Sequence, residues 1–142
     1  MTMAARARTL RIGGFLIVAL GVVHLVATPF IAAMVRANVQ PVTGEWITRP
    51  MLLNHIVVAL LLFPLGGLTA YAARPAAAGE RWALVVVRTA TVTIASFLPT
   101  LVVIMGLRYS APLFLLAAAI LLIATLVLIA AAFGGERVKR RA

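Results

Sequence analysis

Four long apolar segments occupy most of this 142-residue chain and constrain its fold more than any other feature. They are Ile12–Val35, Met51–Ala73, Trp82–Gly106 and Ala111–Phe133. The sequence is 64% hydrophobic and only 11% charged, which is more apolar surface than a soluble domain of this size can bury. Each segment reaches the length of about 20 apolar residues that a helix needs to cross a bilayer. The natural solvent of these segments is therefore lipid.

The segments are expected to be helices, because backbone groups in hydrocarbon must satisfy their own hydrogen bonds. A membrane barrel would show short segments with alternating apolar and polar residues, and these segments do not alternate. The sequence thus predicts an all-α integral membrane protein, a four-transmembrane-helix up-down bundle. We expect one domain over residues 1–142, with helices near 12–35, 51–73, 82–106 and 111–133 and basic tails at 1–11 and 134–142.

The net charge of +10 is distributed unevenly between the two ends of the expected bundle. The tails and the second connection carry most of the basic residues, and the other two connections hold only Arg36, Arg49 and Arg108. By the positive-inside rule, both termini are cytoplasmic. The basic tails then face anionic lipid headgroups rather than nucleic acid. The alanine- and arginine-rich composition indicates a bacterial plasma membrane protein that crosses the membrane several times.

Proline, glycine and serine indicate how the segments are connected. Arg36–Pro50 contains two prolines and a glycine, which predicts an irregular surface loop. Arg74–Arg81 is expected to be a simple turn, and the short connection Leu107–Ser110 makes the last two helices antiparallel neighbours. Ser110 is an expected N-cap, and Gly134–Gly135 an expected stop.

The apolar segments contain only three ionisable side chains, which are His24, His55 and Arg88. Ionisable groups in hydrocarbon are costly, so those that are present indicate where function could lie. All carboxylates of the chain fall outside the segments, which argues against an ion-coupled transporter. The chain has no cysteine, which excludes disulfides and thiolate metal sites.

The two histidines are expected in the outer half of the bundle, with a height difference of about 9 Å between them. Gly14 and Gly21 share a helix face with His24, which makes that face small and polar. A hydroxyl stripe on the third segment follows i, i+4, i+7, i+11 spacing and so lies on one face, at Thr89, Thr93, Ser96 and Thr100. The sequence predicts one polar, ligand-binding pocket formed by His24, Thr28, Asn54, His55, Ser96 and Thr100.

The pocket could hold an apolar ligand such as a lipid or a quinone, or a b-type haem with His24 and His55 as axial ligands. Gly14 and Gly21 would leave room for the macrocycle, whereas the height difference argues against it. A structural alternative is that each histidine only hydrogen-bonds across the bundle. No other metal site is expected, because the chain offers too few ligands. Arg88 is expected to contact an anion or a lipid headgroup on the inner side.

Two further functions remain open from the sequence. The chain could be a non-catalytic interaction subunit that packs against a larger membrane partner or against its own copies. It could also be a small membrane enzyme that acts on a lipid-soluble substrate with a histidine as the acid–base group.

Overall fold

The computed structural model describes residues 1–38, 41–105 and 112–134, without the side chains of 41–47, 105 and 113. In these residues every element is an α-helix: α1 (Met3–Asn38), α2 (Pro41–Ala78), α3 (Arg81–Met105) and α4 (Pro112–Phe133). All four helices are long and apolar enough to cross a membrane. The prediction of an all-helical protein with four candidate transmembrane helices is confirmed.

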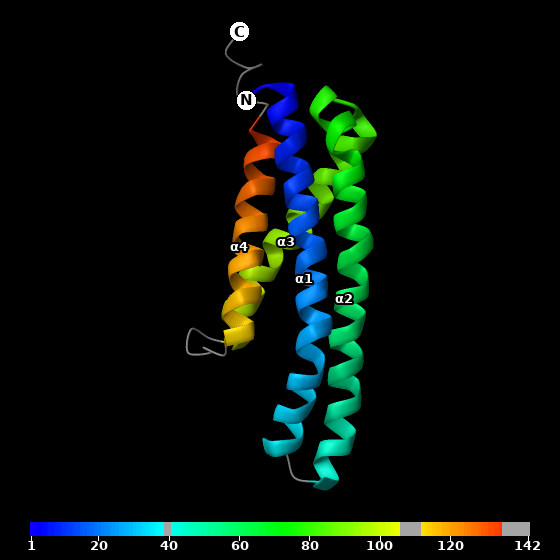
Figure 1. Cartoon of the computed structure of the whole chain (residues 1–142), viewed down its shortest axis with the longest axis vertical. Helices are drawn as coiled ribbons and strands as arrows, with labels where there is room; N and C mark the ends of the chain where they lie inside the picture. Colours follow the sequence, from blue (N-terminus) through cyan, green and yellow to red (C-terminus); the bar gives the residue numbers. More distant parts are fainter. Residues whose placement is uncertain (39–40, 106–111, 135–142) are drawn as a thin grey trace.

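The helices form an up-down bundle in which α1 and α3 each pack against both α2 and α4 (Figure 1). With 36 and 38 residues, α1 and α2 are much longer than α3, which has 25. At 1.5 Å per residue the difference amounts to about 16–20 Å. Figure 1 shows that the α1–α2 hairpin extends past the end of α4 on the side opposite the termini.

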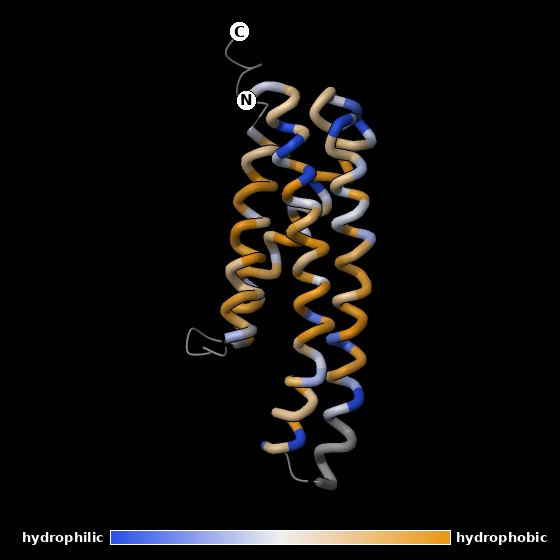
Figure 2. Tube along the Cα trace, viewed as in Figure 1, coloured by the Kyte–Doolittle hydropathy of each residue, from blue (hydrophilic) through white to orange (hydrophobic). Residues whose placement is uncertain are grey.

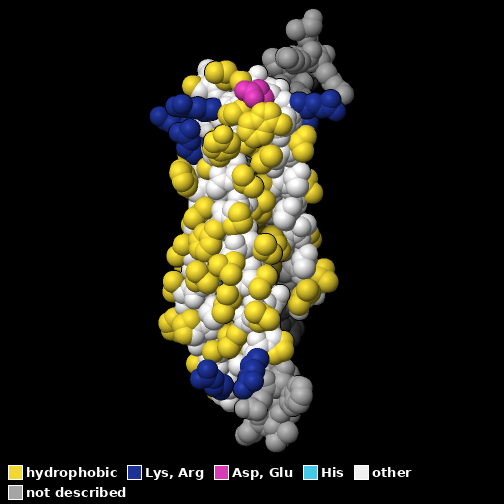
Figure 3. Space-filling model, turned by 90° about the vertical axis from the view of Figure 1, so that its right-hand side faces the viewer, with side chains coloured by type: hydrophobic (Ala, Val, Ile, Leu, Met, Phe, Trp, Pro, Cys, Tyr) yellow, Lys and Arg dark blue, Asp and Glu magenta, His cyan; other side chains and the backbone are white. Residues whose placement is uncertain are grey.

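The surface and the core of the bundle are both apolar. Hydrophobic residues predominate along the middle of the helices, and basic side chains gather at the two ends (Figures 2 and 3). Large apolar side chains such as Phe15, Leu61 and Val103 are exposed, as expected for a surface that faces lipid. The core is built largely from alanine around a few larger side chains, among them Leu10, Ile17, Ile94 and Leu128.

The first two helices extend beyond the predicted boundaries at 12–35 and 51–73. The amino-terminal segment 1–11 is not a tail, because α1 begins at Met3 and Thr2 Oγ1 accepts a hydrogen bond of 3.2 Å from Ala5 N. The prediction of an irregular loop at Arg36–Pro50 is also wrong. α2 begins at Pro41, where a helix has no need of the missing N–H, and continues through Pro50.

The connection between α2 and α3 is the simple turn that the sequence predicts, reduced to Gly79 and Glu80. Gly79 adopts a φ of 93°, and its N–H donates to Ala76 O at 3.1 Å. Glu80 N donates to Pro75 O at 3.0 Å, which completes a Schellman motif. Glu80 is also the N-cap residue of α3, because its carbonyl accepts a hydrogen bond of 3.0 Å from Leu84 N.

At the other helix ends, α4 stops at Phe133, just before the predicted stop at Gly134. The predicted connection Leu107–Ser110, with its N-cap, lies outside the described residues. Arg6 connects the start of α1 to the end of α4. Its Nε donates to Ala131 O at 2.8 Å and its Nη2 to Ala132 O at 3.3 Å. A guanidinium at these carbonyls complements the negative end of the α4 dipole.

Candidate functional site

The candidate site lies on the α1–α2 hairpin, whose two backbones approach closely at facing glycines. A Cβ added to Gly14 would lie 2.7 Å from Gly66 O, and one added to Gly66 would lie 2.6 Å from Gly14 O. One heptad further along α1, a Cβ on Gly21 would lie 3.1 Å from Ala59 O. Small residues at a helix interface allow this close packing in membranes. The face shared by Gly14 and Gly21 is therefore filled by the backbone of α2.

The same pairing brings His24 and His55 into contact. The centroids of their rings are 4.8 Å apart, and the ring planes are inclined by 33°. His24 lies 14 residues before the end of α1 at Asn38, and His55 lies 14 residues after the start of α2 at Pro41. The predicted height difference of about 9 Å is wrong, because it assumed that the second helix begins at Met51.

A hydrogen bond fixes the orientation and tautomer of His24. Its Nδ1 lies 3.0 Å from Leu20 O, which can only accept, so Nδ1 carries the proton. In the neutral ring, Nε2 of His24 is then a hydrogen-bond acceptor. His55 differs, since its Nε2 is buried and has no hydrogen-bond partner in the described part of the chain. A buried polar nitrogen in this state is costly and calls for an explanation.

The other predicted pocket residues have varied surroundings. Thr28 is half-buried four residues after His24, and its hydroxyl donates to His24 O at 2.9 Å. Asn54 is exposed on α2. Ser96 and Thr100 are exposed on α3, and their hydroxyls donate to Thr93 O at 2.7 Å and Ser96 O at 2.8 Å. The structure thus brings the two histidines together, whereas these α3 hydroxyls are bonded within their own helix.

Three buried hydroxyls lie elsewhere in the core, at Thr69, Thr91 and Thr125. Each donates to the carbonyl four residues earlier, at 2.7 to 2.8 Å. Such bonds satisfy the hydroxyl within its own helix, so these residues are structural. In the sequence, Thr91 lies between Thr89 and Thr93 of the predicted hydroxyl stripe. The spacing of the stripe identifies one face of α3, but it does not show which face is buried.

Arg88 extends toward the end of α4, where its Cζ lies 5.5 Å from the centroid of the Phe133 ring. This is the distance of a cation–π contact. The side chain is half-buried.

From the sequence, the arginines near the amino terminus are expected only to face anionic lipid headgroups. Arg8, Arg11 and Arg74 line a groove between α1 and α2 near the termini. The antiparallel pairing of Gly14 with Gly66 explains why residues near 11 and 74 meet. The sequence alone does not predict this pairing, because the position of the turn between α1 and α2 decides which residues face each other.

The histidine pair does not fit a b-type haem, which was one of the ligands considered from the sequence. Two axial imidazoles lie on opposite faces of the porphyrin, with metal–nitrogen bonds of about 2 Å and ring centres about 6 Å apart. The centroids of the His24 and His55 rings are only 4.8 Å apart, which leaves no space for a macrocycle between them. The space that Gly14 and Gly21 were expected to leave is occupied by α2.

Among the described residues, no three His, Cys, Asp or Glu side chains gather as they would around a metal ion. The site therefore consists of two imidazoles in apolar surroundings, one of which presents an oriented acceptor nitrogen. Comparisons with known proteins found no match: no family model, no curated protein and no solved structure is similar to this chain.

Proposed function

We propose that the chain is an integral membrane protein that binds a ligand. Its α1–α2 hairpin holds a lipid-soluble molecule, such as a quinol or quinone, at His24 and His55. The observation that carries this proposal is the contact between the two histidine rings, whose centroids are 4.8 Å apart. Two imidazoles in an apolar hairpin cost free energy, and such residues in membrane helices usually have a function. We also propose that the protein lies in the bacterial plasma membrane.

The chemistry of the pair suits a ligand that has both hydroxyl and carbonyl forms. Because the Nδ1–H of His24 donates a hydrogen bond to Leu20 O, the Nε2 atom of this ring can accept a hydrogen bond from a quinol hydroxyl. The Nε2 atom of His55 has no hydrogen-bond partner among the described residues, and in the tautomer that carries its proton there it can donate to a carbonyl oxygen of the oxidised form. The exposed side chains of Leu25 and Ile56, next to the histidines in sequence, offer apolar surface for the ligand tail.

We place both termini in the cytoplasm and the histidine pair toward the outer side. The end of the bundle that holds the termini carries Arg6, Arg8, Arg11, Arg74 and Arg81, against Arg36 and Arg49 at the hairpin tip. This difference follows the positive-inside rule. His24 is nearer to the tip of the hairpin than to its basic end.

The proposal can be tested by calorimetric titration of the protein in phosphatidylcholine nanodiscs with decylubiquinol, with empty nanodiscs as the blank. We expect saturable binding that weakens about tenfold or more in His24→Phe, which retains a ring to stack on His55 but lacks the acceptor nitrogen. Ser96→Ala is the matched control, because this hydroxyl is bonded within α3. Its affinity should stay within about twofold of the unmodified protein.

Two outcomes would contradict the proposal. One is heat from the protein that does not exceed the heat from empty nanodiscs. The other is a His24→Phe variant that binds decylubiquinol as tightly as the unmodified protein.

A further inference from the structure

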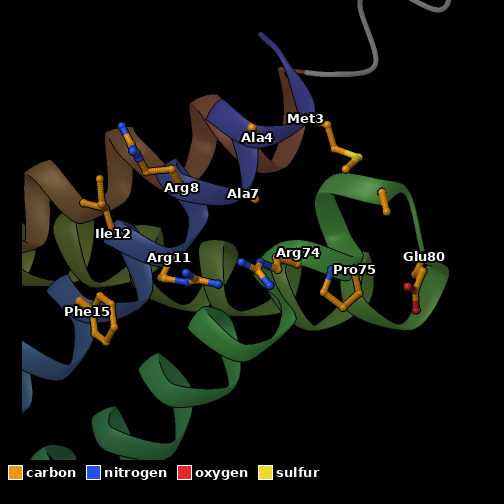
Figure 4. A pocket seen from close by; sticks show the side chains of 11 residues that line it. Met3, Ala4, Ala7, Arg8, Arg11, Ile12, Phe15, Arg74, Pro75 and Glu80 are labelled. Carbon is orange, nitrogen blue, oxygen red and sulfur yellow. The ribbon is translucent and has the colours of Figure 1, made fainter.

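The end of the bundle opposite the histidine pair contains a groove that combines basic and apolar side chains. It lies between the start of α1 and the end of α2 and has a volume of about 630 Å³. Arg8, Arg11 and Arg74 contribute its basic part, and Ile12 and Phe15 contribute to its apolar part. Figure 4 shows the guanidinium groups of Arg11 and Arg74 directed toward each other across the groove, while Arg8 points away.

Two guanidinium groups that face each other repel, and an anion between them would relieve this repulsion. Arg11 and Arg74 make no hydrogen bond or ion pair within the part of the chain that the structure describes. Glu80 is the acidic residue in the groove lining, and its Oε2 already accepts a hydrogen bond of 2.7 Å from Trp82 Nε1. The facing guanidinium groups therefore match a phosphate, which two arginines can hold through several charged hydrogen bonds.

The apolar part of the groove determines what the phosphate should be attached to. Ile12 and Phe15 follow Arg11 along α1 toward the middle of the bundle, and they are 47% and 60% exposed. A molecule with a charged head at Arg11 and Arg74 would lay an acyl chain along these side chains. The groove also lies near the end of the candidate spans, at the level where lipid headgroups meet hydrocarbon.

We infer that the groove between Arg11 and Arg74 is a binding site for one anionic phospholipid, whose phosphate the two arginines hold and whose acyl chain covers Ile12 and Phe15. This site is separate from the histidine pair and does not depend on the function proposed for it. It goes beyond a general attraction of basic residues to the membrane, because it requires two particular side chains.

The experiment is native mass spectrometry of the detergent-solubilised protein, titrated with phosphatidylglycerol or with phosphatidylcholine of the same acyl chains. We expect one phosphatidylglycerol to bind about tenfold more tightly than phosphatidylcholine. The double variant Arg11→Gln/Arg74→Gln should lose this preference. The matched control Arg36→Gln/Arg49→Gln removes the same charge at the hairpin tip and should keep it.

Three results would overturn the inference. Equal affinity of the unmodified protein for both lipids would show that charge is not recognised. Equal loss of preference in both double variants would show a general effect of net charge. Displacement of phosphatidylglycerol by equimolar inorganic phosphate would show a site for free phosphate.

Circular dichroism of each variant establishes that it is folded before titration. If the double variant is unfolded, Arg11→Lys and Arg74→Lys replace it, since each keeps the charge but loses the planar fork. Each lysine variant should bind phosphatidylglycerol several-fold more weakly than the unmodified protein, and unchanged affinity in both would contradict the inference.

Discussion

At the scale of residues, the polar groups of this bundle fall into two classes. The hydroxyls of its helices bond mostly to carbonyls three or four residues earlier, as Thr28, Thr69, Thr91, Ser96, Thr100 and Thr125 all do. Bonds of this kind let a hydroxyl lie in apolar surroundings without a partner on another helix. The histidines differ, because Nε2 of His24 is an acceptor in the neutral ring and the buried Nε2 of His55 has no hydrogen-bond partner among the described residues. His24 and His55 are therefore the residues at which we propose that a ligand binds.

At the scale of elements, the close approach of α1 and α2 decides the geometry of that pair. Gly14 and Gly66 face each other where the two backbones are closest, and Gly21 faces Ala59 one heptad nearer to the histidines. Dispersion and close backbone contact drive such packing in lipid, where burial of apolar side chains gives little. The hairpin thus acts as a rigid support that holds the imidazoles at contact distance.

Gly66→Ala should destabilise the bundle by about 1–3 kcal/mol, because overpacking forces the backbones apart. The added Cβ would lie 2.6 Å from Gly14 O and 2.8 Å from Val18 Cγ2. Gly67→Ala is a control at the neighbouring position, where an added Cβ has nothing within 4 Å. It should be neutral or stabilising by up to about 1 kcal/mol through its helix propensity. Unfolding in mixed micelles, followed by circular dichroism, measures both, and equal stability of the two variants would contradict this packing.

The sequence predicted the four helices because length and apolarity are local properties of a segment. It did not predict the ends of the hairpin. The turn signals at Pro41 and Pro50 do not produce a loop, because α2 begins at Pro41 and continues through Pro50. For the same reason the contact between His24 and His55 could not be predicted, since it depends on where the turn lies.

The hydroxyl stripe of α3 shows a second limit of prediction from sequence. Its spacing correctly places Thr89, Thr93, Ser96 and Thr100 on one face, but all four are exposed. In lipid a face with hydroxyls can point outward when the hydroxyls are satisfied within their own helix, as those of Ser96 and Thr100 are. Polarity therefore does not indicate the buried side of a membrane helix as it does in a soluble protein.

At the scale of the whole molecule, the two ends of the bundle have different chemistry. One end holds the termini, the Arg11–Arg74 groove and the bonds from Arg6 to the end of α4. The other end is the tip of the α1–α2 hairpin, which extends beyond α4 (Figure 1). If the basic end faces the cytoplasm, the phospholipid groove opens to the inner leaflet and the histidines lie toward the outer one.

This orientation can be tested with single cysteines, since the natural chain has none. In intact spheroplasts, Asn38→Cys at the hairpin tip should react with a maleimide that cannot cross membranes. Ala5→Cys, near the start of α1, should react only after permeabilisation. Both positions are exposed, so their difference reports the side of the membrane. The opposite pattern would reverse the proposed topology.

Nuclear magnetic resonance of the ¹⁵N-histidine-labelled protein in nanodiscs can show whether His24 and His55 form one ligand site. The chain has two histidines, so every labelled ring signal comes from this pair. We predict cross-peaks between the two rings in the free protein and a change in their nitrogen shifts when decylubiquinol is added. Rings without mutual cross-peaks, or nitrogen shifts that stay unchanged at saturating ligand, would contradict the account.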